Sequence, residues 1–599
     1  MESSTSEIVT FHENAIESKS SNHIRWLAWA VWLLLVVTTA YCAWPVWYER
    51  AHEHTLGQAG LSQWKMIEDA TFKTFRAYYT DNIYIDEVKG NPNLILARWT
   101  GALTPLWTVV VAVLSLFNTA LIRLSVSVIS GHTLIIGDHP IAHSLASIAS
   151  RKGQKVVHIC DRIKDPVEEG RRIALPRPSH EMGLHIGRAK QARRIIIVKT
   201  NLGNSAELGL VATRMVKAQR KAPFVAIHLE DPSTAEHIHH LSEGDHAYAF
   251  SCLQAEARDV IVRHPPFLLA RNIKAKSVHV LIIGLGHLAE ALVRDVILNT
   301  RTSYQGTPWV TIIDPNPTVE ANFYARYPEI NNAAHIRFMT QIAGDDMPDL
   351  YQMHKGQVPE PVCAVYVCLP DQGLALNAAV AVKERALRQN LFEAPIFVRA
   401  AFGGGLFRPD GGVMCLTTPL QFVGFGRMES AVYASHVLDK DPDFYPRSAY
   451  RAYSQLYKQL HPDMPLLDWE HLSEEFRISN RRIIRHIPAK LSSLGFDLEP
   501  WLSMPEDKRP IIPNLAPGEK LVRNEEERLS LARLEHQRWM NDRIVNGWRY
   551  GPVRSDRQKF HPDLLDYDDL SHHIKGFDFG VIDWLSELIK TKKGGLRRE

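Results

Sequence analysis

Two long runs without charged side chains are the feature that most restricts how this chain can fold. Residues 26–48 (WLAWAVWLLLVVTTAYCAWPVWY) form the first run, and residues 99–122 (WTGALTPLWTVVVAVLSLFNTALI) form the second, between Arg98 and Arg123. A helix of about 20 apolar residues can cross the hydrocarbon core of a bilayer. Tryptophans lie near the ends of the runs, where the indole ring suits the interface with water. Each run is therefore predicted to be a transmembrane helix.

A signal peptide is the alternative for the first run. Such a peptide begins with basic residues and has a shorter apolar core. Four acidic residues precede this run instead: Glu2, Glu7, Glu13 and Glu17. With two spans, both termini lie on one side of the membrane, and residues 49–98 form an extracytoplasmic loop that we expect to have helical character. This describes a multi-pass protein of the cell's inner (plasma) membrane with the bulk of its chain in the cytoplasm.

Charge and cysteine content narrow the function further. The chain has 69 Lys and Arg against 66 Asp and Glu, so no overall positive charge predicts binding to nucleic acid. Its six cysteines are scattered without a C-x-x-C pair, which indicates reduced thiols in a cytoplasmic setting. The partners we expect are the lipid bilayer, a small nucleotide ligand and further copies of the chain in a homo-oligomer.

An internal duplication follows the second apolar run. Residues 132–149 (HTLIIGDHPIAHSLASIA) and 279–296 (HVLIIGLGHLAEALVRDV) both indicate a strand, a glycine turn and an amphipathic helix. In each copy a second strand follows and ends in an aspartate. Strands and helices continue to alternate, which is typical of a doubly wound parallel sheet. Residues 131–270 and 271–430 are therefore predicted to be two α/β Rossmann-like domains.

The second copy carries the residues that a dinucleotide site needs. Gly284 permits the tight turn, Gly286 lets a pyrophosphate approach the backbone, and Ala289 lets the helix pack closely. Asp314 ends the next strand, where its carboxylate can accept hydrogen bonds from ribose hydroxyls. The cofactor expected here is NAD or another adenine nucleotide. In the alternative interpretation the glycines serve packing alone.

The first copy departs from this pattern. His139 stands where the middle glycine would be, and its Cβ would crowd a phosphate. Gly137 and Asp161 occupy other positions of the motif. We therefore expect the first copy to be degenerate.

Two membrane helices followed by tandem Rossmann units resemble the regulator-of-potassium-conductance (RCK) or TrkA-N class, whose cytoplasmic modules sense nucleotides for channels and transporters. The resemblance covers residues 131–430 and implies a regulatory role. No T-V-G-Y-G or G-Y-G sequence lies between the two apolar runs, so the carbonyl filter that selects potassium is missing. A conductance through this chain is therefore expected to discriminate poorly among monovalent ions.

A second resemblance lies near the C-terminus. Residues 531–570 closely resemble the ryanodine-receptor (RyR) repeat, which in prokaryotes also occurs attached to such sensor modules. The matching residues are Leu531, Ala532, Glu535, His536, Trp539, Arg543, Gly547, Trp548, Tyr550, Gly551, His561, Pro562, Leu564, Tyr567 and Leu570, and Lys575 and Asp578 continue the pattern. The resemblance implies a mainly α RyR-like domain over residues 516–585 and a role in bacterial stress or antiviral signalling.

Five residues of this domain are predicted to contact a ligand. His536 and Trp539 lie three apart on a helix and so share a face. Trp548 and Tyr550 lie on a glycine-flanked turn. Aromatic planes beside His536 and the Arg543 guanidinium suit a stacked base and a phosphate. The alternative is a small helical core in which the tryptophans only bury apolar area, and for Trp539 we favour this alternative.

No sequence pattern assigns an enzymatic activity. Neither a nucleophile elbow nor a Walker loop is present. The histidine-rich stretch 235–248 (AEHIHHLSEGDHAY) follows a strand and is expected to be a solvated helix rather than a metal site. The segment after the second Rossmann unit has histidines in no recognisable arrangement: His436, His461, His471 and His486. We therefore expect no catalytic residues and no metal ligands.

These observations divide the chain into seven parts. They are an N-terminal cytoplasmic tail (1–22), a membrane module (23–130), the two Rossmann-like domains, a helical connector (431–515), the RyR-like domain and a basic tail (586–599), which we expect to be disordered from residue 590. The function that uses all of them is a membrane-bound nucleotide-sensing receptor or effector, in which RCK-like and RyR-like domains gate the two-helix module. Gating would open an ion conductance or perturb the membrane. The alternatives are a membrane-tethered NAD-dependent oxidoreductase and a non-catalytic scaffold with dead Rossmann domains.

Overall fold

The computed structural model describes most of the chain. It covers residues 22–55, 63–79, 90–161, 167–176, 181–200, 202–219, 222–230, 247–343, 350–354, 356–400, 422–439, 441–460, 463, 466–505 and 508–598. The predicted tail before Asn22 and most of the histidine-rich stretch lie outside these ranges. The chain divides into two compact units, one of residues 1–134 and 150–192 and the other of residues 135–149 and 193–599.

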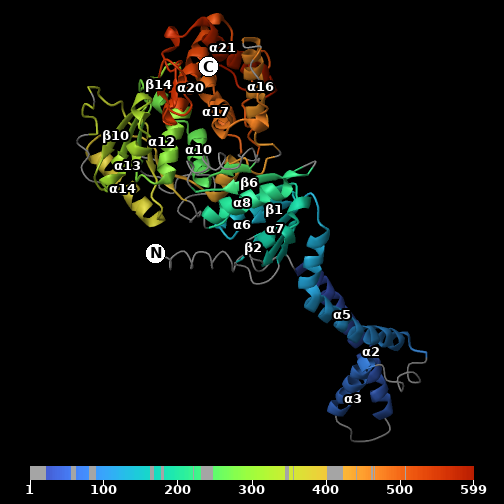
Figure 1. Cartoon of the computed structure of the whole chain (residues 1–599). Coiled ribbons are helices and arrows are strands. Elements are labelled where there is room, and N and C mark those ends of the chain that lie inside the picture. Colours follow the sequence, from blue (N-terminus) through green and yellow to red (C-terminus); the bar gives the residue numbers. More distant parts are fainter. Residues whose placement is uncertain are drawn as a thin grey trace. The chain divides into compact units, whose positions relative to one another are not determined.

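Long helices dominate the N-terminal part of the chain (Figure 1). They are α2 (Asn22–Thr55), α3 (Gln63–Arg76) and α5 (Pro92–Val128), with the 3₁₀ helix η1 (Ala77–Tyr79) after α3. Helices α2 and α5 lie side by side, and α3 packs against α2. Thr39 Oγ1 donates a hydrogen bond to Thr100 Oγ1 at 2.8 Å across the α2–α5 contact. The helical character predicted for the loop between the spans is thus confirmed.

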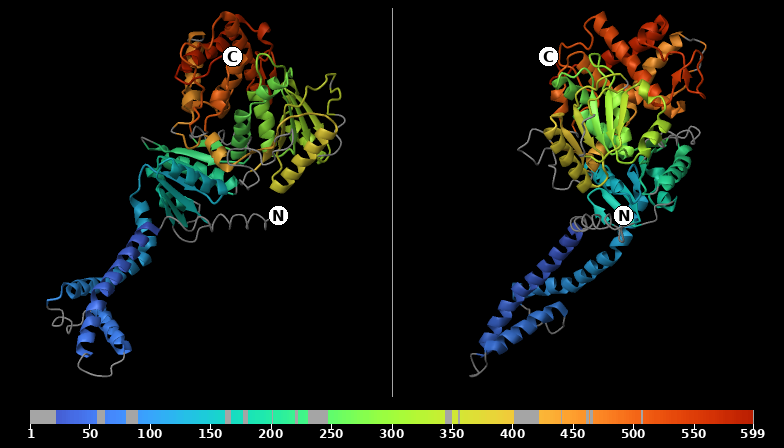
Figure 2. Two further views of the ribbon diagram at one scale, coloured as in Figure 1. Left: turned by 180° about the vertical axis from the view of Figure 1, so that it is seen from behind. Right: turned by 90° about the vertical axis from the view of Figure 1, so that its left-hand side faces the viewer.

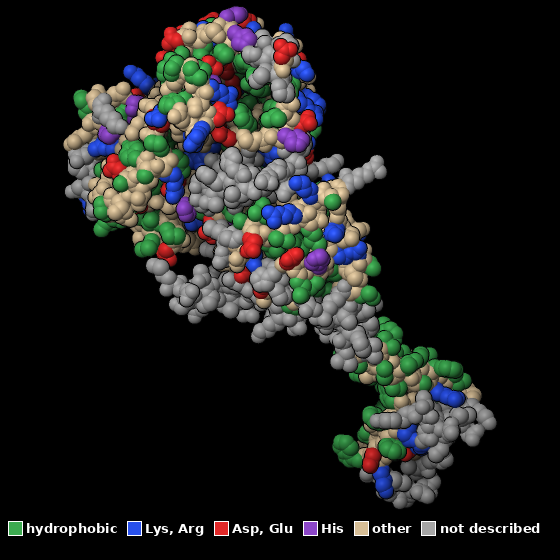
Figure 3. All heavy atoms as spheres, viewed as in Figure 1, with side chains coloured by type: hydrophobic (Ala, Val, Ile, Leu, Met, Phe, Trp, Pro, Cys, Tyr) green, Lys and Arg blue, Asp and Glu red, His purple; other side chains and the backbone are tan. Residues whose placement is uncertain are grey.

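The surface of the α2–α5 pair is apolar. Segments Trp29–Glu53 and Pro92–Ala112 are long and apolar enough to cross a membrane. Only 17% and 33% of their most apolar windows are buried inside the structure, whereas a core helix of a soluble protein would be mostly buried. Hydrophobic side chains gather over this part of the chain in Figure 3. The predicted spans 26–48 and 99–122 therefore coincide with two helices of suitable length and composition.

The first Rossmann-like domain contains a seven-stranded sheet with the order β3-β4-β2-β1-β5-β6-β7. Its strands are β1 (Thr133–Ile136), β2 (Val156–Cys160), β3 (Val167–Glu169), β4 (Arg172–Pro176), β5 (Arg194–Ile197), β6 (Phe224–His228) and β7 (Ala247–Phe250). Its helices are α6 (Pro140–Arg151), α7 (Glu181–Ile186), η2 (Ala189–Gln191) and α8 (Leu202–Lys217). Strand β2 pairs with β4 and strand β6 with β5 and β7, all in parallel, while β3 is an antiparallel edge strand.

The second domain repeats this strand order as β10-β9-β8-β11-β12-β13. Its strands are β8 (His279–Ile283), β9 (Trp309–Ile313), β10 (His335–Met339), β11 (Ala364–Val367), β12 (Ile396–Arg399) and β13 (Phe422–Phe425), and all neighbours pair in parallel. Helices α12 (His287–Asn299), α13 (Thr318–Arg326), η3 (Ile330–Asn332) and α14 (Gln372–Arg388) belong to it, and helices lie on both faces of the sheet (Figure 2). Apart from β3, both sheets follow the 3-2-1-4-5-6 order of dinucleotide-binding folds, which confirms the predicted duplication.

Helices α10 (Cys252–Arg263) and α11 (Pro266–Asn272) connect the two Rossmann-like domains. Ala257 and Ile261 of α10 are buried in the same core as the strands of the second domain, and α10 packs against α12. The core of the second domain therefore begins before residue 271, where the sequence placed its boundary. The glycine turn indicated where the first strand of the second domain lies. No sequence pattern indicated which of the two sheets α10 packs against.

The C-terminal helices share a core with the second Rossmann-like domain. They are α15 (Met428–Ala434), α16 (Phe444–Leu460), η4 (Trp469–His471), α17 (Glu474–Arg485), α18 (Ile487–Ser493), α19 (Glu499–Leu502), α20 (Glu525–Val545), η5 (Tyr567–Asp569) and α21 (His572–Leu588), with the short strands β14 (Arg549–Tyr550) and β15 (Phe560–His561). Helix α16 packs against α17 and α21 (Figure 1). The described residues of 431–515 are mostly helical, as predicted, and they pack into this body.

A buried ionic network joins α18 and α20. Lys490 Nζ lies 2.7 Å from Glu535 Oε2, and Arg538 Nη2 lies 2.8 Å from Glu535 Oε1. Burial alone would raise the pKa of the Glu535 carboxyl, but the two cations outweigh it and lower this pKa to about 2. Beside them, Arg482 of α17 binds Asp542. Removing one partner from such a set leaves an uncompensated buried charge, so the network fixes these helices together.

Residues 590–598 pack against the rest of the chain, which corrects the prediction of a disordered basic end from residue 590. Ala516 N donates a hydrogen bond to Leu596 O at 2.9 Å. Arg598 binds the carboxylate of Glu527. The run of basic residues indicated a solvated end, but backbone hydrogen bonds and an acidic partner from another helix hold it in place.

Gly137 is the glycine whose substitution we expect to damage the first Rossmann-like domain. Its φ is 143°, and a Cβ added here would lie 1.7 Å from Val198 O. Gly137→Ala should therefore lower the free energy of unfolding by about 3 kcal/mol or more, measured by chemical denaturation.

Gly131→Ala is the control for this substitution. Gly131 also has positive φ, at 65°, but a Cβ there meets no atom within 4 Å. Its cost should stay at about 1–2 kcal/mol from backbone strain alone. Equal losses in the two variants would contradict the steric explanation.

Candidate nucleotide turn and RyR-domain cluster

The glycine turn of the second domain follows β8, which lies next to β11 where the strand order reverses. Doubly wound sheets bind ligands at this position. Gly284 has a φ of 82°, and a Cβ on it would lie 2.7 Å from Leu369 Cδ2. Gly286 is exposed, and a Cβ on it would meet no atom within 4 Å. The turn therefore requires the first glycine, and the second leaves open space before α12.

Asp314 follows β9 and holds this turn. Its Oδ2 accepts a hydrogen bond from Leu285 N at 2.8 Å, and its Oδ1 accepts one from Asn316 N at 2.9 Å. Each carboxylate oxygen has a second lone pair, which leaves capacity for ribose hydroxyls. Ala289, in the first turn of α12, is fully buried, as close packing of this helix requires. The structure thus brings all four predicted cofactor residues to one end of the sheet.

The N-terminus of α12 provides positive charge beside the turn. The helix has 13 residues, Gly286 is its N-cap, and no side chain caps it. Its first amide groups and its dipole suit an anion at Gly286. Glu290 in the first turn is bound by Arg326, which offsets the negative charge of this carboxylate. The arrangement is chemically suited to a diphosphate with a ribose toward Asp314.

The first domain uses its equivalent turn differently. His139 Nδ1 accepts a hydrogen bond from Ile141 N at 3.2 Å, so the imidazole caps α6. The ring of His139 lies 5.5 Å from that of His228, and burial lowers the pKa of His228 to about 3. The His139 side chain therefore occupies the N-terminus of α6, where a phosphate would otherwise bind. This favours the interpretation that the first copy is degenerate.

Four of the five predicted RyR-domain residues form one cluster. His536 and Trp539 of α20 stack with ring centroids 5.5 Å apart, as their spacing predicted. The Arg543 guanidinium lies 5.8 Å from the centroid of Trp539 and 5.3 Å from that of Trp548. Tyr550 on β14 differs from these, since its side chain is 53% exposed.

Glu475 of α17 determines the environment of Trp548 and Arg543. Its Oε1 accepts hydrogen bonds from Trp548 Nε1 at 2.8 Å and from Arg543 Nη1 at 2.6 Å. Trp548 is only 4% exposed. Burial lowers the pKa of Arg543, and the charge of Glu475 opposes this change. The geometry therefore favours a core role for Trp548, because its indole N–H already has a partner within the protein.

Sequence reasoning assigned no site role to Glu475 or to His561 of β15. The His561 ring lies edge-on to Trp539 at 5.0 Å between centroids, and burial and nearby arginines lower its pKa to about 4. His561 was already part of the RyR pattern, so its place in the domain was visible but its contact was not. Glu475 precedes that pattern by more than one helix, and no spacing rule connects them.

Asp578 of α21 holds His536 in place. The distance from His536 Nδ1 to Asp578 Oδ2 is 3.4 Å, and His536 Nε2 lies 2.9 Å from Leu565 O. Burial opposes protonation of His536, but the hydrogen bond and charge of Asp578 outweigh it and raise the pKa of the imidazole. Burial also raises the pKa of Asp578, to about 6. Both ring nitrogens thus have partners inside the domain.

The chain thus combines a pair of long apolar helices, two Rossmann-like domains of one topology and a C-terminal helical region. Residues 522–591 match the RyR domain family. The resemblance to the RyR repeat is confirmed, and the match covers residues 522–591 where 516–585 was predicted.

Among solved structures, the chain is similar to the "GsuK Channel", at 15% identity with 69% of this chain and 98% of that chain covered and a TM-score of 0.34. The "GsuK channel bound to NAD" is 12% identical over 69% of this chain and 82% of that chain, with a TM-score of 0.35. GsuK bound to ADP is 14% identical over 69% and 98%, with a TM-score of 0.32. The NAD and the ADP named in these descriptions are ligands of those channels.

Gly286→Asp should abolish binding of an adenine nucleotide to the second domain. The new carboxylate would repel a diphosphate at the start of α12, while its Cβ meets no protein atom within 4 Å. Calorimetry against NAD, ADP and ATP measures the loss, and the unfolding temperature should not change. His139→Ala, in the first domain, should leave the affinity within a few-fold. Equal losses from both substitutions would show that binding is not confined to the second domain.

The His536–Asp578 pair predicts a pH-dependent stability. Both pKa values are higher in the folded protein than in the unfolded chain, so the folded protein binds more protons from about pH 4 to above about pH 6.5. The stability contributed by the pair is present below this window and is lost as the pH rises through it. Asp578→Asn removes the titration of residue 578. It also removes the carboxylate that raises the pKa of His536.

The unfolding temperature of Asp578→Asn should therefore change less between about pH 5 and pH 8 than that of the native protein. Asp583→Asn is the matched control, because Asp583 is an exposed carboxylate on the same helix. This control should keep the native pH profile. An Asp578→Asn profile parallel to the native one would exclude the pair as its source.

Proposed function

We propose that this chain is a membrane-bound nucleotide-sensing receptor or effector. NAD or another adenine nucleotide binds at the Gly284–Gly286 turn and Asp314 of the second Rossmann-like domain. Binding alters the packing of the Rossmann-like and RyR domains, and these gate the two-helix membrane module as an ion conductance or a perturbation of the bilayer. Bacterial stress or antiviral signalling is the setting that the RyR resemblance implies.

Helix α12 is the observation that carries this proposal, because it begins at the nucleotide turn and ends against the RyR domain. Ile297 O, near its end, accepts a hydrogen bond from Asn541 Nδ2 of α20 at 3.3 Å. Just beyond α12, Arg301 O lies 3.0 Å from His486 Nε2. A ligand that moves the start of this helix therefore also acts on groups held by α17, α18 and α20.

A short connection supports coupling between α5 and the first sheet. Helix α5 ends at Val128 and β1 begins at Thr133. Gly131 N donates a hydrogen bond to Gln191 O at 2.8 Å, and His132 Nε2 lies 2.8 Å from Gly187 O. A hydrogen-bonded connection of this length transmits movement better than a flexible linker does.

The two membrane helices found among the described residues are too few to enclose a pore, so an ion conductance would require a homo-oligomer. The exposed apolar side chains of α2 and α5 suit hydrocarbon, and helices satisfy their own backbone hydrogen bonds there. We place the helices in the inner (plasma) membrane and the nucleotide-fold domains in the cytoplasm.

Full-length protein reconstituted into liposomes tests this function. NAD, ADP and ATP are added separately, and ion flux and release of a trapped dye are recorded. At least one nucleotide should change flux or leakage for the native protein and should have no effect on Gly286→Asp. Nucleotide binding without any membrane response would overturn the effector role. A response retained by Gly286→Asp would overturn sensing through the second domain.

Asn541→Ala tests the route through α12. The substitution removes the hydrogen bond to Ile297 O, so the membrane response should fall by about fivefold or more while nucleotide affinity stays within a few-fold. Arg533→Ala changes an exposed position of the same helix and should keep the native response. Unfolding temperatures of both are compared, since losing a buried hydrogen bond costs about 1–3 kcal/mol. A native response from Asn541→Ala would remove α20 from the route.

A further inference from the structure

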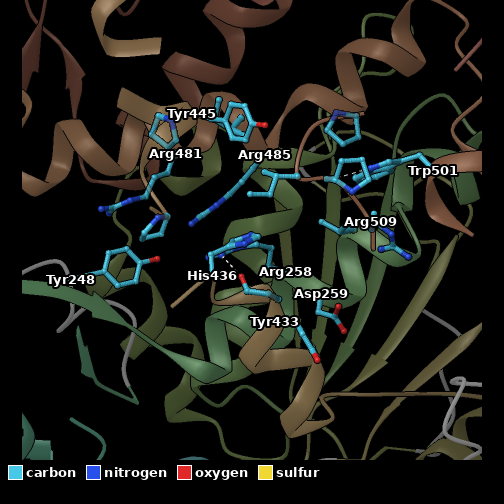
Figure 4. A pocket seen from close by; sticks show the side chains of 18 residues that line it. Tyr248, Arg258, Asp259, Tyr433, His436, Tyr445, Arg481, Arg485, Trp501 and Arg509 are labelled. Atoms are coloured by element: carbon cyan, nitrogen blue, oxygen red, sulfur yellow. Dashed lines mark hydrogen bonds between the residues drawn. The ribbon is translucent and has the colours of Figure 1, made fainter. Parts of the chain in front are cut away.

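A cavity of about 170 Å³ lies among α10, α15, α16 and α17. None of the residues of the glycine turn or the RyR cluster lines it. Aromatic side chains form part of its wall, among them Tyr248, Tyr445 and Trp501 (Figure 4). Four arginines also line it: Arg258, Arg481, Arg485 and Arg509. So many cations around a small cavity raise the question of which groups compensate their charge.

Two of the nearby carboxylates are already used by other arginines. Arg481 binds Asp443 with both arms of its guanidinium, Nε to Oδ1 and Nη2 to Oδ2, each at 2.7 Å. Asp259, which also lines the cavity, binds Arg263 on its own helix. These pairs leave the charges of the remaining arginines to be compensated from elsewhere.

Arg258 and Arg485 point into the same space from α10 and α17 (Figure 4). Arg258 Nη1 donates a hydrogen bond to Ala434 O at 2.9 Å, and its buried Nε has no partner among the described residues. The guanidinium group of Arg485 forms neither a hydrogen bond nor an ion pair with any residue that the structure describes. The charge of Asp295 acts on both guanidinium groups, but no ion pair joins Asp295 to either in the described part of the chain.

Arg258 and Arg485 carry like charges that lie close enough to affect each other. Burial lowers the pKa of Arg485, and the neighbouring positive charge of Arg258 lowers it further. Arg258 is buried and Arg485 is half-buried. Like charges that are partly withdrawn from water repel each other and are normally paired. Guanidinium groups bind phosphate oxygens through two parallel hydrogen bonds, so a phosphate between them would remove the repulsion.

We propose that this cavity is a second anion site, which binds the phosphate groups of a phosphorylated small molecule between Arg258 and Arg485. Its volume of about 170 Å³ is below the range of about 300–1,000 Å³ typical of ligand pockets. The cavity therefore admits a phosphate or diphosphate group rather than a whole dinucleotide. The Arg509 guanidinium lies 5.5 Å from the Trp501 ring centroid and places a further cation at the cavity wall.

Inorganic pyrophosphate is the probe that tests this site. Its effect on the unfolding temperature of the full-length protein is measured against potassium chloride at equal ionic strength, and its affinity is measured by calorimetry. Pyrophosphate should raise the unfolding temperature of the native protein. Arg485→Gln should abolish this increase and weaken binding by about tenfold or more. Without pyrophosphate, Arg485→Gln should be at least as stable as the native protein, because it removes one of two repelling charges.

Two further variants guard against a trivial explanation. Arg388→Gln removes an exposed arginine of α14 and should respond to pyrophosphate as the native protein does. Arg258→Lys keeps the charge but loses the planar group with two donor arms, so it should bind pyrophosphate more weakly while remaining folded. Equal binding by all of these variants would overturn the assignment.

Gly286→Asp separates this cavity from the nucleotide turn. The increase with pyrophosphate should persist in Gly286→Asp, and its loss there together with its retention in Arg485→Gln would overturn the proposal. In the same background, tighter binding of ADP than of pyrophosphate would identify a nucleotide as the source of the phosphate. Binding of pyrophosphate alone would identify free polyphosphate. Binding of neither would also overturn the second site, whatever the outcome at the turn.

Discussion

The carboxylate of Glu535, buried between Lys490 and Arg538, determines how the C-terminal half of the chain is held together. These charges are stable in the interior only as a set, so α18 and α20 keep a fixed relation. Helix α20 is hydrogen-bonded in turn to the end of α12, which begins at Gly286. The glycine turn and the RyR cluster are therefore parts of one packed body, connected by shared helices.

Local pattern was enough to predict the two Rossmann-like domains and the glycine turn. Gly284 and Gly286 indicate a turn with a positive φ followed by an exposed N-cap. Asp314 indicates the end of the next strand. The doubly wound parallel sheet of each copy followed from the repeated alternation of strand and helix, which is compatible with few sheet topologies, whereas the strand order is seen in the structure. Spacing within a single helix likewise placed His536 and Trp539 on one face.

Contacts between distant segments could not be predicted in this way. Glu475 accepts hydrogen bonds from Trp548 and Arg543 and lies on another helix. These two side chains, which the sequence suggested as ligand contacts, therefore already have hydrogen-bond partners inside the protein. Arg258 and Arg485 of the arginine-lined cavity come from α10 and α17, more than 200 residues apart in the sequence, and each alone resembles an ordinary surface residue. The packing of α10 with the second domain could not be predicted either, because the apolar face of α10 is compatible with the sheet of either Rossmann-like domain.

The hydrogen bonds between α2 and α5 limit how the proposed membrane module can move. Trp32 Nε1 binds Thr108 Oγ1 at 2.9 Å, and Thr39 binds Thr100 about two helical turns away. Two polar bridges at different depths prevent one helix from rotating or sliding against its neighbour, since hydrocarbon offers no substitute partner for the broken bond. Each hairpin would then tilt as a rigid lever, and opening would take place between neighbouring hairpins rather than within one.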